Sequence, residues 1–76
     1  MKYCLVEVVE RDIKMPEFFD TFEEAHAKME ECYFKANGCN PANYDPVELD
    51  GELSTWTAYC SNVNDDHCDW EIFKIK

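Results

Sequence analysis

The sequence is poor in basic side chains. It contains 7 Lys and Arg residues against 17 Asp and Glu residues, which gives a formal net charge of −10 at pH 7. A field of that sign repels nucleic acid and anionic membrane surfaces at long range. The composition therefore disfavours direct binding of nucleic acid or of a membrane.

The sequence also lacks a long apolar run, an internal repeat, a linker and a low-complexity tract. The apolar stretch Cys4–Val6 ends at the carboxylate of Glu7, which is unlike a signal peptide or a membrane span. We therefore expect a cytoplasmic protein with one domain over residues 1–76. A chain of 76 residues builds one thin core, and an enclosed ligand pocket of about 300–1,000 Å³ would consume most of it. We expect no enzyme and no cofactor.

No paired Cys-x-x-Cys motif is present among the five cysteines. An odd number at irregular spacing favours reduced thiols, most of them small core residues. A zinc-stabilised domain is an alternative, with Cys60, His67 and Cys68 around one loop and Cys39 or Cys32 completing the ligand set. Adjacent residues on a strand point to opposite faces, so His67 and Cys68 make an awkward ligand pair and an awkward base and nucleophile. We predict no metal site and no catalytic residue.

The N-terminal part of the chain predicts two strands. Residues 2–10 alternate, with Cys4, Val6 and Val8 on one face, as in a strand with one fully apolar side. The charged residues 10–14 are typical of a turn. The following segment, Met15–Phe19, predicts a short strand that its proline confines to a sheet edge.

The next segment predicts an amphipathic helix over residues 22–37. Thr21–Glu24 has the pattern of a capping box, in which a hydroxyl and a glutamate satisfy free backbone donors at a helix start. Apolar residues then recur at steps of three and four as far as Ala36. Gly38 supplies the left-handed residue that ends a helix. On the polar side, His26 is expected to bond Glu30 one turn further on.

The C-terminal half predicts a connector and three strands. Asp50–Gly51 is typical of a two-residue hairpin turn, and both tryptophans, Trp56 and Trp70, are expected in the core. The expected segments are a connector at 39–46, strands at 47–49, 52–60 and 68–75, and a polar loop at 61–67. Together these elements predict an α+β fold in which one helix packs on one face of an antiparallel sheet of four or five strands, in the order ββαβββ.

The candidate binding residues are acidic. Glu23, Glu24, Glu30 and Glu31 share the helix side opposite the apolar stripe, and residues seven apart lie about 10.5 Å apart along the axis. Phe34 falls among these acids on the helical wheel, where an exposed ring would anchor a partner. The alternative is an ordinary solvated face, offset by nearby lysines.

Further carboxylates are expected in two other places. Asp50 and Glu52 surround the predicted hairpin turn, and Asp65 and Asp66 lie in the last loop. The negative field is therefore distributed over several surfaces, which suits a broad basic partner.

Three segments carry a resemblance to known proteins: the Met1–Tyr3 start, the Phe19–Ala25 helix entry and the terminal run Trp70–Ile75. With them the chain resembles small acidic proteins of phages and mobile elements. Some of those are counter-defence inhibitors, including anti-restriction and anti-CRISPR proteins that imitate nucleic acid. The resemblance implies such a role and assigns no functional residue.

These observations favour a non-enzymatic inhibitor or regulator that binds a basic, nucleic-acid-binding protein by charge mimicry. Such mimicry needs carboxylates held on a rigid scaffold, because DNA presents about one charge per 1.7 Å of axis. An alternative is a structural or assembly module that forms a homodimer through a sheet edge, burying Phe18 or the Asp50 hairpin.

Overall fold

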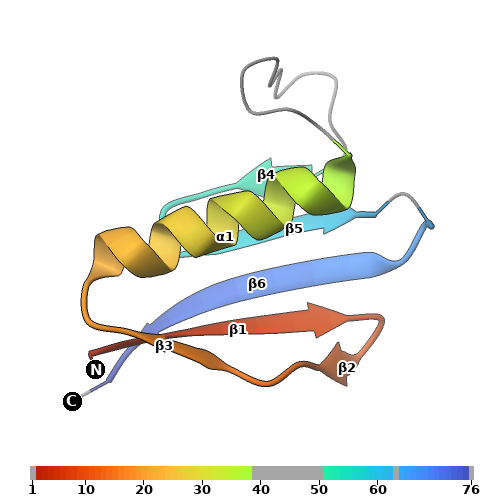
Figure 1. The fold of residues 1–76 in the computed structure, drawn as a ribbon. Helices are drawn as coiled ribbons and strands as arrows, with labels where there is room; N and C mark the ends of the chain where they lie inside the picture. The colour runs from red at the N-terminus through yellow and green to blue at the C-terminus, as the bar shows by residue number, and fades with distance from the viewer. Residues whose placement is uncertain (1, 39–50, 63, 76) are drawn as a thin grey trace.

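The computed structural model describes residues 2–38, 51–62 and 64–75, which form one helix packed on one face of an antiparallel sheet (Figure 1). The described part confirms the predicted α+β class, with the order βββαβββ in place of ββαβββ. The elements are β1 (Tyr3–Val9), β2 (Asp12–Ile13), β3 (Glu17–Phe19), α1 (Phe22–Asn37), β4 (Gly51–Leu53), β5 (Thr57–Ser61) and β6 (His67–Lys74).

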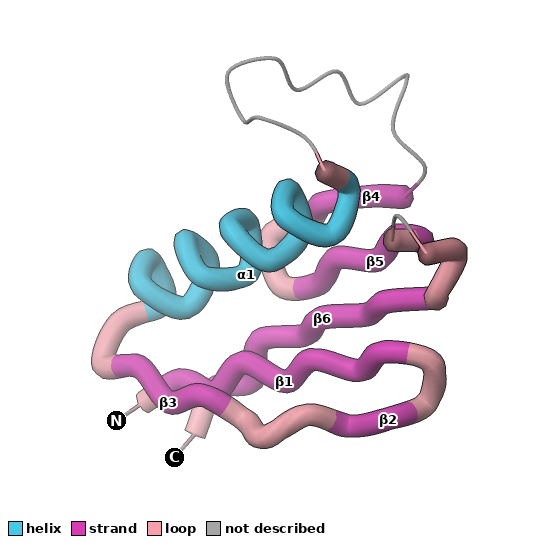
Figure 2. The backbone as a smooth tube through the Cα atoms, turned by 45° about the vertical axis from the view of Figure 1, so that its right-hand side comes forward, coloured by secondary structure: helices cyan, strands magenta, loops and turns pink. Residues whose placement is uncertain are grey.

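The two long strands, β1 and β6, pair along their length at the middle of the sheet (Figure 2). The strand order is β2-β1-β6-β5-β4, and β3 pairs with the same edge of β1 as β2. Val8 and Val9 pair with β2, while Tyr3, Cys4 and Leu5 pair with β3. One edge of the sheet is thus an interrupted strand, and Pro16 lies just before β3, where the edge leaves its missing N–H unneeded.

The extra strand, β2, lies in the segment 10–14 that was predicted to be a turn. The actual turn is only Glu10 and Arg11, whose φ angles are 50° and 71°. Two positive φ angles are typical of a tight two-residue hairpin loop, normally built from Asn, Asp or Gly. The chain therefore reverses within two residues that are not typical of such a turn. After the turn, Lys14 N–H donates to the Glu7 carbonyl at 2.8 Å, which continues the pairing with β1.

The helix has the predicted bounds and ends. Glu24 N–H donates to Thr21 Oγ1 at 3.2 Å, and the Thr21 hydroxyl donates to the Glu24 carboxylate at 3.0 Å. Gly38 has φ 64° and its N–H donates to the Lys35 carbonyl. A left-handed residue at this position satisfies carbonyls that the last turn leaves free.

The predicted continuous strand 52–60 is wrong, because the chain reverses between β4 and β5. Ser54 N–H donates to the Thr57 carbonyl at 2.8 Å, and Leu53 pairs with Ala58. Gly51 lies in β4 opposite Cys60, with φ 127°, and an added Cβ would approach the Tyr59 carbonyl oxygen to 2.1 Å. Both the close backbone approach and the positive φ therefore require glycine at this position. The segments 39–46 and 47–49 and Asp50 lie outside the described residues, so the hairpin turn at Asp50–Gly51 stays a prediction.

The core lies between α1 and the sheet. Strand β6 alternates strictly, with Cys68, Trp70 and Ile72 buried toward the helix and the residues between them exposed. The Trp70 indole N–H donates to the Glu7 carboxylate at 2.6 Å, which satisfies the one polar atom of a ring that is 2% exposed. Trp70 is therefore a core residue, as predicted.

The other side of the sheet has no helix over it in the described part of the chain (Figure 1). Because directly opposite residues of antiparallel strands share a face, the register fixes which side chains lie there. We call this side the open face; its centre is formed by Val6, Val8, Thr57, Asp69, Glu71 and Phe73. In the described part of the chain, no helix is long and apolar enough to cross a membrane.

Candidate protein-binding surface

The four helix glutamates lie on the side of α1 turned away from the sheet, and most are held by neighbours. Glu23, Glu24 and Glu31 are exposed, and Glu30 is partly buried. Glu24 is held by its bonds to the cap residue Thr21. Glu31 lies 3.8 Å from the Lys28 ammonium group, in the i,i+3 arrangement that stabilises helices modestly. Short contacts therefore restrain Glu24 and Glu30, a longer one restrains Glu31, and Glu23 is exposed in the first turn.

A histidine connects this helix to the β4–β5 turn. His26 Nδ1 lies 2.7 Å from Glu30 Oε1, which confirms the predicted contact, and Nε2 lies 3.3 Å from the Ser54 carbonyl oxygen. The His26 ring also lies against the Phe22 ring at a centroid distance of 5.6 Å. These contacts fix the position of Glu30 against the body of the protein, a constraint that the helix pattern alone does not reveal.

An exposed tryptophan lies beside these glutamates. Trp56 was predicted to be a core residue, but it is 44% exposed at the β4–β5 turn. One side of its ring packs on Phe22 at a centroid distance of 4.6 Å and on Tyr3 at 6.4 Å. A residue at the tip of a tight turn cannot reach the middle of the sheet, so the ring covers the end of the core and leaves its other side in solvent.

A shallow hollow of about 370 Å³ lies on the same end of α1. Its lining includes Phe22, Glu23, His26, Ala27 and Glu30. The lining thus combines two carboxylates, Glu23 and Glu30, with the Phe22 ring and the Ala27 methyl group. Trp56 packs on Phe22 beside this hollow, and tryptophan is among the residue types most enriched at binding hot spots.

Phe34 was predicted to be an exposed ring that anchors a partner, but the structure buries this ring. Phe34 is only 7% exposed, belongs to the core cluster, and its ring packs edge-on against Tyr33 at 5.5 Å. A helical wheel gives only the angle at which a side chain leaves the axis. Burying a phenyl ring is worth about 1.5–3 kcal/mol, which favours a rotamer that covers it. The exposed aromatic ring near the start of the helix is therefore that of Trp56, and the ring of Phe34 is buried.

The remaining predicted acids do not join the helix glutamates. Glu52 accepts a hydrogen bond from the Ser54 hydroxyl at 2.9 Å, and Asp50 lies outside the described residues. Asp65 and Asp66 lie in the β5–β6 loop, near the C-terminal end of α1 (Figure 2). That loop is held by Asn62, whose side-chain oxygen accepts from Asp66 N–H at 2.9 Å. These carboxylates extend the negative field rather than forming one site.

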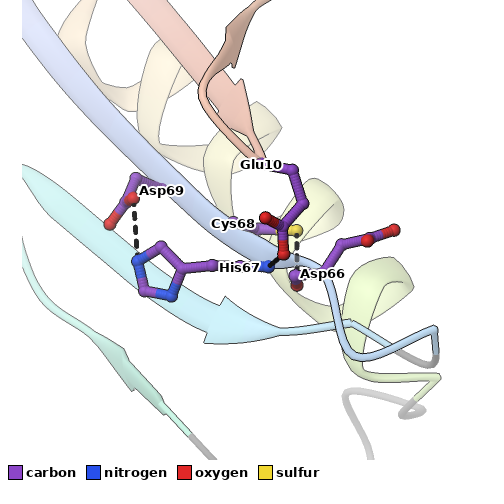
Figure 3. Close-up of polar contacts among 5 residues, drawn as sticks. All are labelled: Glu10, Asp66, His67, Cys68 and Asp69. Atoms are coloured by element: carbon purple, nitrogen blue, oxygen red, sulfur yellow. Dashed lines mark hydrogen bonds and ion pairs between the residues drawn. The ribbon is translucent and has the colours of Figure 1, made fainter.

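The proposed zinc ligands lie on two sides of the sheet. Figure 3 shows the His67 ring directed toward Asp69, with Nε2 2.9 Å from Oδ2, while the Cys68 thiol points away and donates to the Asp66 carbonyl at 3.6 Å. Strand alternation separates His67 from Cys68 and from Cys60, the partner of Cys68 across the ladder. Within residues 2–38, 51–62 and 64–75, no group of three or more His, Cys, Asp or Glu side chains is arranged to hold a metal ion.

The same region holds the turn of β1 against β6. Glu10 accepts a hydrogen bond from His67 N–H at 2.7 Å, and Glu10 N–H donates to the His67 carbonyl at 2.8 Å. Figure 3 shows this carboxylate reaching across from the β1–β2 turn to the start of β6. The contact supports the two positive φ angles of that turn, so this cluster has a structural explanation.

Of the described cysteines, Cys4, Cys60 and Cys68 are buried and Cys32 is partly buried. Burial raises the pKa of the Cys68 thiol, and the negative charge of Glu7 raises it further. Burial likewise raises the pKa of Cys32, with the charge of Glu7 second. A thiol with a raised pKa is a weak nucleophile at neutral pH.

Comparison of the chain with protein-family models, with curated proteins and with solved structures gives no significant match.

Proposed function

We propose that this chain is a non-enzymatic protein-binding module that inhibits or regulates a basic, nucleic-acid-binding protein. The observation that carries the proposal is the N-terminal end of α1, where contacts restrain the carboxylates of Glu24 and Glu30 and the half-exposed ring of Trp56 packs on Phe22. A mimic of nucleic acid needs charges that stay in place, because mobile carboxylates lose side-chain entropy on binding. The contacts of Glu24, Glu30 and Glu31 reduce that cost.

The charge balance of the whole chain supports the same partner class. A net charge of −10 attracts a basic surface from a distance and gives fast, salt-sensitive association. Trp56 then adds apolar contact area that ions in solution do not replace. The resemblance to small acidic phage proteins, some of them counter-defence inhibitors, agrees with this role.

The test is competition with nucleic acid. Immobilised protein is expected to retain a basic host protein that excess duplex DNA and rising salt both release. Trp56→Ser is expected to weaken this binding by about tenfold or more, as loss of an interface anchor does. A retained protein that duplex DNA does not displace would contradict the proposal.

A matched pair of variants separates this surface from net charge. Glu23→Gln with Glu30→Gln removes two carboxylates, one of them 2.7 Å from His26 Nδ1. Asp12→Asn with Glu17→Gln also removes two carboxylates, one of them in an ion pair with Lys14. We expect the first pair to weaken binding and the second to leave it nearly unchanged. Equal weakening by both pairs would mean that only total charge matters.

A further inference from the structure

The open face carries more exposed apolar surface than a sheet side facing only water needs. Phe73 on β6 is 47% exposed and Phe18 on β3 is 50% exposed, and both lie opposite Cys4 of β1 in the ladder. Tyr59 and Ile13 are also exposed large side chains. Single apolar residues on a surface are ordinary, but a group on one side of one sheet indicates a surface that meets another molecule.

This surface has a hollow at its centre. A cavity of about 320 Å³ opens there, and Val6, Val8 and Phe73 contribute its apolar lining. Asp69, Glu71 and Thr57 are also among its lining residues. Glu71 lies between Val6 and Thr57 across the ladder, so a carboxylate borders an apolar floor.

The charges at the centre of the open face are of one sign, and Lys2 lies at its rim, beyond the end of β1. Among the described strand residues whose register places them on this side, the acids are Asp69, Glu71 and Glu52, and there is no Lys or Arg. His67 also lies on this side, and its Nε2 is 2.9 Å from Asp69 Oδ2. A second copy of this chain, stacked centre to centre on this face, would bring Asp69 and Glu71 of both copies together, and such like-charge contact costs binding energy.

We infer that the open face is a docking surface for a cationic amphipathic segment of a partner protein. Apolar side chains of that segment contact Val6, Val8 and Phe73, and an arginine or lysine pairs with Glu71 and Asp69. Arginine fits best, because its planar guanidinium lies on apolar surface while donating to carboxylates. This surface is separate from the proposed helix surface, since α1 covers the opposite side of the sheet (Figure 1).

The experiment follows amide chemical shifts of the labelled full chain during titration with a short amphipathic helical peptide built of leucine, arginine and alanine. A matched peptide with glutamate in place of arginine is the negative probe. We expect the first peptide to shift the amides of Val6, Thr57, Glu71 and Phe73, with little change at Ala27. The glutamate peptide is expected to leave all of them in place.

Two variants with the same charge change locate the site. Glu71→Gln is expected to weaken binding of the arginine peptide by about tenfold, as loss of a charged hydrogen-bond partner does. Glu17→Gln is the control, because Glu17 is exposed and lies opposite Leu5, on the other side of the sheet from the open face. It is expected to change affinity by less than about twofold. Both positions are exposed, so both variants are expected to fold, and the amide spectrum checks this directly.

Three outcomes would overturn the inference. Shifts confined to α1, or an absence of shifts at millimolar peptide, would show that the open face does not take a cationic segment. Equal weakening by Glu71→Gln and Glu17→Gln would reduce the effect to general charge attraction. Concentration-dependent self-association of the free chain through open-face amides would assign the face to a second copy. None of these results bears on DNA-competed binding through Glu23, Glu30 and Trp56, so the two proposals fail separately.

Discussion

The two sides of the sheet are built from alternate residues of the same strands, yet one side is buried under a helix and the other is exposed. On β6, Trp70 and Ile72 are buried under α1, whereas Glu71 and Phe73 face away from it. One helix covers one layer, and a two-layer fold of this size leaves the second side of its sheet to solvent or to a partner. The helix side is therefore explained by folding alone, and the open face is not.

The difference teaches how to separate stability from recognition in this chain. Substitutions on the helix side are expected to change the free energy of unfolding. Substitutions on the open face are expected to change binding and to leave folding nearly intact. Each prediction below tests one part of that division.

The largest effect is expected at the centre of the helix side. Trp70→Ala would remove a buried ring and leave the Glu7 carboxylate without its 2.6 Å donor, at a cost of about 3–5 kcal/mol. Urea denaturation followed by circular dichroism measures the loss. Because that cost approaches the whole stability of a small domain, Trp70→Phe is the milder companion and is expected to lose less. A Trp70→Ala protein as stable as the wild type would break the comparison.

A smaller effect is expected where the covering helix begins. Thr21→Ala removes the side chain that accepts from Glu24 N–H, and loss of such a cap typically costs about 1 kcal/mol. Thr21→Ser keeps the hydroxyl and is expected to stay close to the wild type in the same denaturation assay. If the two variants were equally destabilised, the cap hydrogen bond would not be the cause.

High pH is expected to weaken the helix side further. Burial raises the pKa of Cys32 and Cys68 above the ordinary value of 9.0, so the unfolded chain loses these protons first. The free energy of unfolding is therefore fully retained below about pH 9 and falls as the pH rises above it. Denaturation at about pH 8 and about pH 10 measures the slope. A Cys32→Ala, Cys68→Ala variant is expected to show a flatter slope, whatever its absolute stability.

The smallest effect on folding is expected on the open face. Phe73→Thr replaces an exposed ring with a residue that favours strands, and its free energy of unfolding is expected to stay within about 0.5 kcal/mol of the wild type. Differential scanning calorimetry beside the Trp70 variants gives the comparison within one strand. A loss as large as that of Trp70→Ala would mean that the open face is part of the folding core.

The sequence predicted the parts of the fold that are encoded locally. The helix over 22–37 followed from Thr21, the apolar stripe and Gly38, because a capping residue, a period and a left-handed stop each have a distinct residue type. The alternation of Trp70 and Ile72 placed β6 correctly. These signals need no knowledge of the rest of the chain.

The missed features depend on contacts between distant segments. The turn at Glu10 and Arg11 uses positive φ angles without Gly, Asn or Asp, and it is supported by the bond from His67, a residue far along the chain. The β4–β5 turn likewise lacks glycine and proline at Thr55 and Trp56. Without that turn, a pattern rich in aromatic and β-branched residues predicts a continuous strand.

The candidate site was predicted in its charges and not in its aromatic residue. Helical spacing alone places Glu23, Glu24, Glu30 and Glu31 on one side. It does not tell which aromatic side chain is buried by its neighbours. Phe34 was therefore expected to be exposed and Trp56 to be buried, the reverse of the structure. Burial of a ring depends on its three-dimensional neighbours, and a turn tip is a poor place to find them.

The interrupted edge formed by β2 and β3 has a consequence for how this molecule meets others. Strands of two and three residues, separated near Pro16, offer an incoming chain too few consecutive backbone donors and acceptors to extend the sheet. At the β2–β3 border, lateral growth by strand addition is thus discouraged, and contact at this edge falls to side chains rather than to the backbone.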